Sequence, residues 1–121
     1  MAYTISADHE HNLLYIKYQG DISIVERKSA VIEISAMLDE LHFFNILVDL
    51  CDANMAADSL EEQDKFASSL STNPMLSKCK LAYLSNTDLD DNFFIETMAK
   101  VRHIKCTHVT KLEDAYDWLN E

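Results

Sequence analysis

Glycine and proline are almost absent from this sequence, which has one of each, Gly20 and Pro74, in 121 residues. The phosphate-binding loops of dinucleotide and nucleoside-triphosphate enzymes need several closely spaced glycines, so neither loop can be written onto this chain. No window as long as about 18 residues is wholly apolar, and the first residues lack the basic and apolar regions of a secretory leader. These absences exclude standard nucleotide-binding enzymes and predict a cytoplasmic protein without an integral membrane segment.

Cysteine and basic residues are also scarce. Cys51, Cys79 and Cys106 are widely spaced and odd in number, so we expect reduced thiols and neither a disulfide framework nor a zinc site. The 10 Lys plus Arg stand against 21 Asp plus Glu, and the formal net charge is −11. A surface with that charge repels polyanions, which argues against nucleic acid and anionic membranes as partners. We expect no metal and no cofactor.

Strand-forming patterns are present along the whole chain. The 121 residues are 48% hydrophobic, which matches one ordinary domain, residues 1–121, with enough apolar side chains for a core. Runs over 3–7 and 13–19 flank a polar segment and predict an antiparallel hairpin with a turn longer than two residues. Later strands are predicted over 46–50, 81–84 and 104–109, the first of them central and the last at a sheet edge.

Helical periodicity lies between these strands and predicts helices over 24–41, 60–71, 89–103 and 111–119. Three starts have the capping-box pattern, in which a hydroxyl accepts the amide three residues on, namely Ser23, Ser59 and Thr110. Asp88 is the predicted cap of the remaining helix. The side chains expected to face the core are Ile24, Val31, Leu38 and Leu41 in the first helix, Leu60, Ala67 and Leu70 in the second, and an apolar band from Phe93 to Ile104 in the third.

These elements sum to the order ββαβαβαβα. Parallel strands joined by right-handed helical crossovers form a layered structure. The predicted fold class is therefore α/β, a single layered domain with a five-stranded mixed sheet flanked by helices. The pattern does not determine the order of the strands.

Two acids, Asp49 and Asp52, mark the end of the predicted central strand, from which a short acidic loop leads to Ser59. Crevices of strand-helix sheets open at the carboxyl ends of the strands, so the pair is a candidate for strand-end binding. It can bind a cation, share a proton or accept hydrogen bonds from a ligand. The structural alternative has Asp49 bonded to neighbouring backbone amides and Asp52 solvated in the loop.

Phe93, Phe94 and Ile95 are consecutive large apolar residues, which cannot all face one core from an α-helix. At least one of them points elsewhere. One hypothesis is an apolar pocket shared with Met98 and Met55, and another is a surface that binds a second copy of the chain. The remaining alternative is a helix that is covered on two sides and buries a wide face.

Cys106 and His108 form the one pair in the sequence that a nucleophilic enzyme would use, since they lie two apart on a predicted strand and share a face. An oxyanion loop is also needed, and no glycine is near this pair. We therefore expect no catalysis there.

The element order and three segments resemble the SpoIIAA-like family of small bacterial proteins. The segments are Tyr15-Ile16-Lys17-Tyr18-Gln19-Gly20-Asp21, Leu47-Val48-Asp49-Leu50-Cys51-Asp52-Ala53 and Leu112-Glu113-Asp114-Ala115-Tyr116-Asp117-Trp118-Leu119. The resemblance covers nearly the whole chain and implies the fold that STAS domains share with CRAL-TRIO lipid-binding domains.

The STAS resemblance singles out Ser59. A STAS antagonist carries a phosphorylatable serine just after an aspartate at the start of the helix that follows the central strand, and Asp58-Ser59 stands at the corresponding place. The family continues with glycine, whereas this chain continues Leu60-Glu61-Glu62, whose carboxylates would repel a phosphate. Ser59 is also fully explained as a helix cap. Both a phosphorylation or partner site at Ser59 and Asp58 and a plain cap stay open.

The sequence thus predicts a non-enzymatic bacterial cytosolic binding or regulatory module of the SpoIIAA-like type, acting on a protein partner or as a homodimer. The alternative is a carrier or sensor of a small apolar, lipid-like ligand, as the CRAL-TRIO likeness implies. A hydrolase that uses Cys106 and His108 is the third hypothesis.

Overall fold

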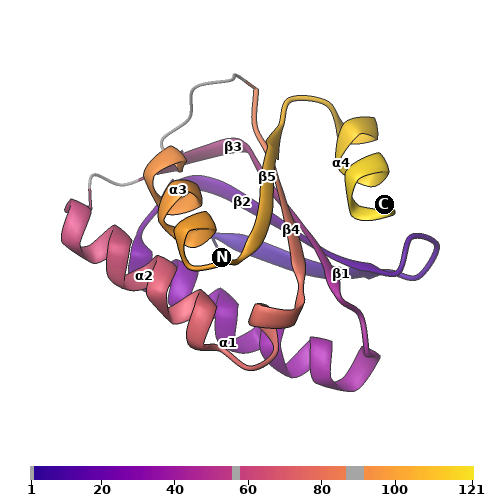
Figure 1. Cartoon of the computed structure of the whole chain (residues 1–121). Coiled ribbons are helices and arrows are strands. Elements are labelled where there is room, and N and C mark those ends of the chain that lie inside the picture. The colour runs from indigo at the N-terminus through magenta and orange to yellow at the C-terminus, as the bar shows by residue number, and fades with distance from the viewer. Residues whose placement is uncertain (1, 56–57, 87–91) are drawn as a thin grey trace.

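The computed structural model describes residues 2–55, 58–86 and 92–121 (Figure 1). The elements in chain order are β1 (Tyr3–Asp8), β2 (Leu13–Ile22), α1 (Ile24–Leu41), β3 (Asn45–Met55), α2 (Leu60–Thr72), a short 3-10 turn η1 (Leu76–Lys78), β4 (Lys80–Leu84), α3 (Phe93–Val101), β5 (Lys105–Val109) and α4 (Leu112–Leu119). The predicted order ββαβαβαβα and the α/β class are confirmed. No helix within these ranges is long and apolar enough to cross a bilayer.

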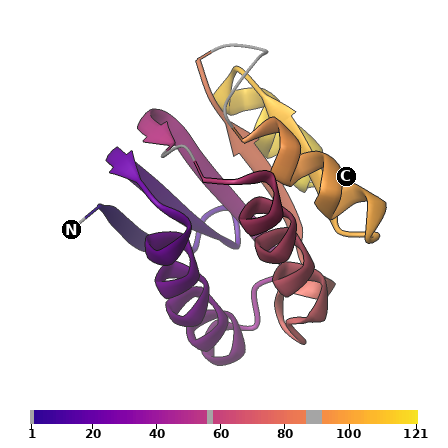
Figure 2. The same cartoon turned by 90° about the vertical axis from the view of Figure 1, so that its left-hand side faces the viewer.

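The five strands lie side by side in chain order, β1-β2-β3-β4-β5. β1 pairs antiparallel with β2, and the later pairs are parallel. Each helical crossover therefore steps in the same direction, and right-handed crossovers that step one way place their helices on one face. Figure 2 shows α1, α2 and α3 together in front of the sheet, and Figure 1 shows α4 on the other side. Within the described residues, the helical cover of the second face consists of the eight residues of α4.

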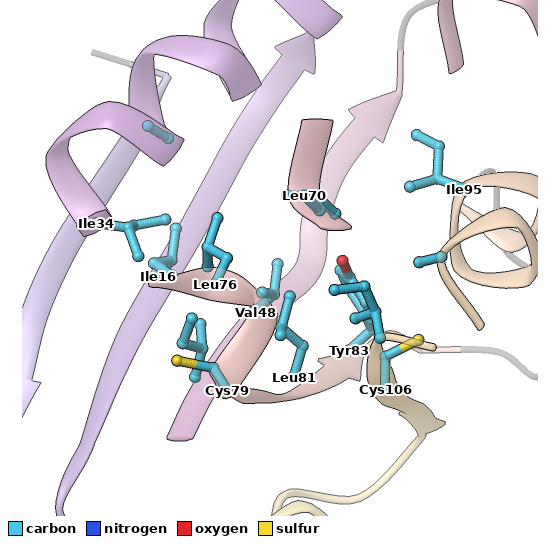
Figure 3. Packing of buried hydrophobic residues seen from close by; sticks show 14 of the residues in the cluster. Ile16, Ile34, Val48, Leu70, Leu76, Cys79, Leu81, Tyr83, Ile95 and Cys106 are labelled. Atoms are coloured by element: carbon cyan, nitrogen blue, oxygen red, sulfur yellow. The ribbon is translucent and has the colours of Figure 1, made fainter. Parts of the chain in front are cut away.

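Alternate side chains along the strands point to opposite faces of the sheet and form two hydrophobic cores. The larger one joins Ile16, Val48, Leu81 and Tyr83 of the sheet to α1, α2 and α3 (Figure 3). The smaller one lies under α4 and consists of Leu13, Leu47, Ala82, Leu84, Ala115 and Leu119. Because β3 is the third of five strands and contributes to both cores, its residues 46–50 are all buried. This confirms the predicted central strand.

The central strand is longer than its apolar run predicts. It extends to Met55 and pairs there with the end of β2, where Gly20 is opposite Ala53 and Ile22 is opposite Met55. The strand predicted over 46–50 is therefore too short, and the prediction that the acidic loop includes Asn54 and Met55 is wrong, because both belong to β3. Polar residues alternate with apolar ones at both strand ends, and apolar members such as Ile22 and Met55 belong to the larger core or pack against it, so no unbroken apolar run reveals the extension. Gly20 has φ +75°, a conformation that glycine adopts without strain.

The capping-box pattern predicts the N-cap correctly at two helix starts and incorrectly at a third. Ser23 and Ser59 are the N-caps of α1 and α2, and their hydroxyls accept the amides of Glu26 at 3.3 Å and Glu62 at 3.1 Å. The predicted cap at Thr110 is wrong, because α4 begins at Leu112 and its N-cap position is Lys111. The helix starts one residue later than the box requires. The predicted cap Asp88 lies outside the described residues.

The core faces of α2 and α3 differ from the predicted ones. Leu60 was expected to be buried, but it is the first residue of α2 and is exposed, while Phe66 joins Ala67 and Leu70 in the core. Val101, at the last position of α3, is likewise exposed and not part of the apolar band. Both exceptions lie at helix ends, Leu60 at the first position of α2 and Val101 at the last position of α3.

Candidate functional site

The carboxyl edge of the parallel strands gathers most of the predicted site residues. β2, β3 and β4 all end there, and α1, α2 and α3 all begin there, because each helix returns antiparallel to its strand. Ser59 therefore lies at the same edge as the end of β3, as the sequence predicted. Crevices at such an edge are the usual binding places of open α/β sheets.

Ser59 is exposed and occupies an extended N-cap conformation with φ −65° and ψ 157°. Its Oγ accepts the Glu62 amide, and the Asp58 carbonyl accepts a hydrogen bond from Gln63 Nε2 at 2.9 Å. Glu61 forms an ion pair with Lys65 at 3.3 Å, which holds one of the neighbouring carboxylates along the helix. The capping role is thus observed, and a regulatory role for Ser59 and Asp58 stays a prediction.

Each of the three helices on this face begins with an exposed large apolar side chain. Val25, Leu60 and Phe93, which we call the helix-start residues, are 73%, 62% and 63% exposed. They occupy the second position of α1 and the first positions of α2 and α3. Single exposed apolar residues are ordinary on protein surfaces. All three stand at helix starts on the edge of the sheet at which Ser59 also lies, so this edge is the candidate contact surface.

The three consecutive residues at the start of α3 divide as helical geometry requires. Phe93 is exposed, Phe94 is half-buried and Ile95 is buried in the larger core. Met98 is half-buried and packs against the same core. The prediction that at least one of the triplet points away from the core is confirmed. Phe93 is the member that a partner can reach.

A small cavity in the larger core bears on the apolar-ligand alternative. It measures about 20 Å³ and lies among Ile16, Tyr18, Arg27, Phe66 and Tyr83, with further apolar neighbours. That volume holds about one water molecule, whereas ligand pockets usually measure about 300–1,000 Å³. None of Phe93, Met98 and Met55 lines it. This cavity gives no support to a carrier of lipid-like ligands.

A buried polar cluster that the sequence did not reveal connects α1 to the start of α3. Arg27 is only 2% exposed, and its Nη1 donates to Asn92 Oδ1 at 2.6 Å. Asn92 Nδ2 in turn donates to Glu96 Oε2 at 2.9 Å. The Arg27 guanidinium also lies over the Phe66 ring, 4.9 Å from its centroid. Arg27 and Asn92 are 65 positions apart, so no local pattern predicts their contact.

At the end of the central strand, Asp49 is buried and Asp52 is exposed. Tyr15 Oη donates to Asp49 Oδ2, and the Cys51 amide donates to Asp49 Oδ1 at 2.9 Å. Lys17 Nζ lies 2.8 Å from Asp52 Oδ2 and 3.8 Å from Asp49 Oδ2. The expected backbone bond to Asp49 is present, while Asp52 lies on the strand and pairs with Lys17, not free in a loop.

Burial and hydrogen bonding determine the protonation states of Asp49, Tyr15 and Cys51. Burial alone would raise the pKa of Asp49, but the bonds from Tyr15 and Cys51 outweigh it and hold the pKa below the ordinary value of 3.8. Burial and the Asp49 charge raise the pKa of Tyr15, and the same causes raise the pKa of the Cys51 thiol to about 11. At neutral pH Asp49 is therefore ionised, and the phenol and thiol are protonated.

The lowered pKa of Asp49 predicts an acid-dependent loss of stability. A carboxyl whose pKa is lower in the folded than in the unfolded chain stabilises the fold above the unfolded value, and this stabilisation is lost as pH falls below 3.8 toward the folded pKa. Urea unfolding should show Asp49→Asn about 1–3 kcal/mol less stable than wild type at pH 7, with a smaller difference at pH 3. Asp52→Asn, on the exposed side of the strand, is the control. An equal deficit at both pH values would contradict the assignment.

The predicted Cys106 and His108 pair does not form a nucleophilic arrangement. Cys106 is buried in the larger core, where its Sγ lies 3.6 Å from the Glu96 carbonyl oxygen, and burial raises the pKa of its thiol to about 11. His108 Nε2 instead hydrogen-bonds with Ser85 Oγ, from the end of β4. A thiol that stays protonated at neutral pH is a poor nucleophile.

Comparisons with known proteins place the architecture. No family model matches the sequence, and no curated protein matches it. Among solved structures, an uncharacterized DUF3478-family protein with a SpoIIAA-like fold from Shewanella loihica PV-4 is similar at a TM-score of 0.65 and 12% identity, over 98% of this chain and 94% of that one. The anti-sigma factor antagonist SpoIIAA in its unphosphorylated form is similar at a TM-score of 0.61 and 12% identity, over 98% of both chains. The predicted SpoIIAA-like fold is confirmed.

Proposed function

We propose that this chain of SpoIIAA-like fold is a non-enzymatic regulatory module of the STAS type, which acts by binding a protein partner at the carboxyl edge of its sheet. The observation that carries the proposal is the exposed Ser59 at the same edge of the sheet as the exposed helix-start residues Leu60 and Phe93. The similarity to an anti-sigma factor antagonist, at 12% identity, supports the regulatory class.

The chemistry of this edge indicates what the partner presents. α2 and α3 are neighbours, joined by the ion pair between Arg102 and Asp64 at 2.8 Å, so Leu60 and Phe93 belong to adjoining helices (Figure 2). Glu61 and Glu62 are exposed in the first turn of α2. Protein interfaces commonly have apolar centres with polar rims. The partner surface is therefore apolar with basic residues around it, which complements a chain of net charge −11.

The contact surface is tested by charge substitution with a matched control. Phe93→Glu and Leu60→Glu place a carboxylate on the helix-start residues, and Ile32→Glu does the same at a 72% exposed position in the middle of α1. Each protein is used to capture partners from extracts of the source organism, with quantitative mass spectrometry. We expect one partner protein to be captured equally by wild type and by Ile32→Glu. With both edge variants the captured amount of that protein should fall by about tenfold or more.

Two outcomes would contradict the proposal. In the first, no captured protein distinguishes the edge variants from Ile32→Glu. In the second, native mass spectrometry shows a wild-type dimer that both edge variants convert to folded monomers, so that the surface serves a second copy of the chain instead. A monomeric wild type excludes that second copy.

Ser59 is tested separately as the point of control. Ser59→Ala should lower the free energy of unfolding by about 1 kcal/mol, while Ser59→Asp should leave it nearly unchanged, because aspartate caps helices as well as serine. If Ser59 controls the contact, Ser59→Asp weakens partner capture although the protein stays folded. Ser29→Asp, which adds the same charge at an exposed position of α1, is the control. Equal capture by both variants would leave Ser59 as a cap only.

A further inference from the structure

The second face of the sheet contains a cavity of about 220 Å³. The three crossover helices lie on the first face, so that among the described elements α4 is the helix that covers the second (Figure 1). α4 packs on β4 and the neighbouring strands, and no helix of the described ranges lies over the β1 and β2 side of this face. The residues that line the cavity are Ser6, Asp8, Leu13, Tyr15, Asp49, Leu84, Leu112 and Tyr116.

The walls combine two carboxylates, two phenol rings and apolar side chains. Asp49 is 6% exposed, and its hydrogen bond from Tyr15 fixes both groups on the strands. Asp8 accepts hydrogen bonds from the His11 amide at 3.1 Å and from Nδ1 at 2.8 Å. The His11 ring is stacked on Tyr116, with ring centroids 4.2 Å apart and an interplanar angle of 4°. The cavity is therefore built from interlocked groups on β1, β2, β3 and α4.

The carboxylates of this cavity are ionised at neutral pH. Burial opposes ionisation of Asp8, but its bonds to His11 hold its pKa below the ordinary value. The pKa of Asp49 is lowered in the same way by its own hydrogen bonds. Burial raises the pKa of Tyr116, and the charges of Asp8 and Glu10 raise it further. The tyrosine rings thus stay neutral, with the electron-rich faces that attract cations.

Two basic groups lie near the carboxylates of the cavity. His11 Nδ1 is 2.8 Å from Asp8 Oδ2 and is the partner of that carboxylate. Lys17 lies closer to Asp52, at 2.8 Å, than to Asp49, at 3.8 Å, and it is not among the lining residues. Asp49 is therefore the lining carboxylate that an added cation can approach.

We propose that this cavity binds a small organic cation, an ammonium group on a short apolar body. The carboxylate of Asp49 and the rings of Tyr15 and Tyr116 attract the ammonium group, while Leu13, Leu84 and Leu112 contact the apolar body. The volume lies below the roughly 300 Å³ at which pockets for drug-sized ligands begin, which selects a ligand of a few carbon atoms. The site lies on the opposite face from α2 and α3 and does not depend on the proposed partner contact.

Calorimetric titration with choline and with butylammonium tests the charge requirement. The control is the neutral isostere of choline, in which a tert-butyl group replaces the trimethylammonium group. We expect one of the two cations to bind with one-to-one stoichiometry and at least about tenfold more tightly than the neutral isostere, a difference that the cation–π and carboxylate contacts supply. Absence of binding by both cations, or equal binding of the neutral isostere, would overturn the proposal.

Matched variants locate the site. Asp49→Asn should weaken cation binding at least about tenfold, while Asp39→Asn, which removes the same charge from an exposed position of α1 on the other face of the sheet, should leave binding unchanged. Tyr116→Leu, at a half-buried position of α4, should also weaken binding and keeps the test decisive if Asp49→Asn fails to fold. An equal loss with Asp39→Asn and Asp49→Asn would show attraction by net charge alone and would overturn the site.

Discussion

Replacing Arg27 with alanine should lower the free energy of unfolding by about 3–5 kcal/mol. The guanidinium is 2% exposed, donates to Asn92 and lies over the Phe66 ring. Alanine removes the hydrogen bond, leaves a void beside an existing cavity and takes away the positive charge that Asn92 links to Glu96. Urea unfolding followed by circular dichroism measures the change.

Two further variants separate the causes of this loss. Lys28→Ala, at the exposed neighbouring position, should change stability by no more than about 0.5 kcal/mol. Arg27→Met keeps most of the volume and removes the charge, so it should cost less than Arg27→Ala. The Nε of Arg27 is buried without a hydrogen-bond partner among the described residues, which makes an apolar replacement less costly still. A loss below about 1 kcal/mol for Arg27→Ala would show that the cluster contributes little.

The second large effect is expected at Phe66. Phe66→Ala should lower the free energy of unfolding by about 3–5 kcal/mol, because the ring is 2% exposed in the larger core. Leu60→Ala, in the same helix, should change it by no more than about 0.5 kcal/mol, since Leu60 is exposed. The two substitutions remove apolar side chains of comparable size, so thermal unfolding of the pair reports directly which face of α2 meets the sheet.

The reverse order of effects would mean that α2 is rotated about its axis relative to the described arrangement. The contact between Phe66 and Arg27 adds a second check. In a double-mutant cycle, Phe66→Ala and Arg27→Ala should be non-additive by about 0.5 kcal/mol or more, because the guanidinium and the ring are in contact. Strictly additive losses would contradict that contact.

Local patterns predict the elements of this fold because buried faces of strands and helices require apolar residues at regular spacings. The apolar run from Ile46 to Leu50, broken only by Asp49, predicts a strand covered on both faces, and that is where β3 lies. Ser23 and Ser59 predict caps because the capping bond spans only three residues. Such signals require no knowledge of the rest of the chain.

The errors arise where position relative to the sheet decides burial. Leu60 fits an apolar face by its spacing, but it precedes the part of α2 that packs on the sheet. Arg27 is charged, yet Asn92 and two aromatic rings make its burial favourable. Both outcomes depend on residues far away in the sequence.

The candidate sites likewise combine residues that local patterns predict with residues that only the tertiary structure brings together. Ser59 and Asp49 were predicted because they lie next to a helix start and a strand end. Tyr15 and Lys17 reach Asp49 only through the register of β2 with β3, in which Lys17 is opposite Asp49. Asp8 and Tyr116 meet through the imidazole of His11, across more than a hundred residues of chain. Strand order had to be known before any of these groups could be placed.

The sequential strand order has a consequence for biosynthesis. Every strand after the first pairs with the one made just before it, so each new strand leaving the ribosome meets an edge that already exists. Assembly can proceed from the N-terminus without waiting for a distant segment. The exception is α4, which is translated after all five strands and only then shields Leu47 and Ala82 on the second face. A nascent chain stalled before residue 112 would present that apolar strip to chaperones.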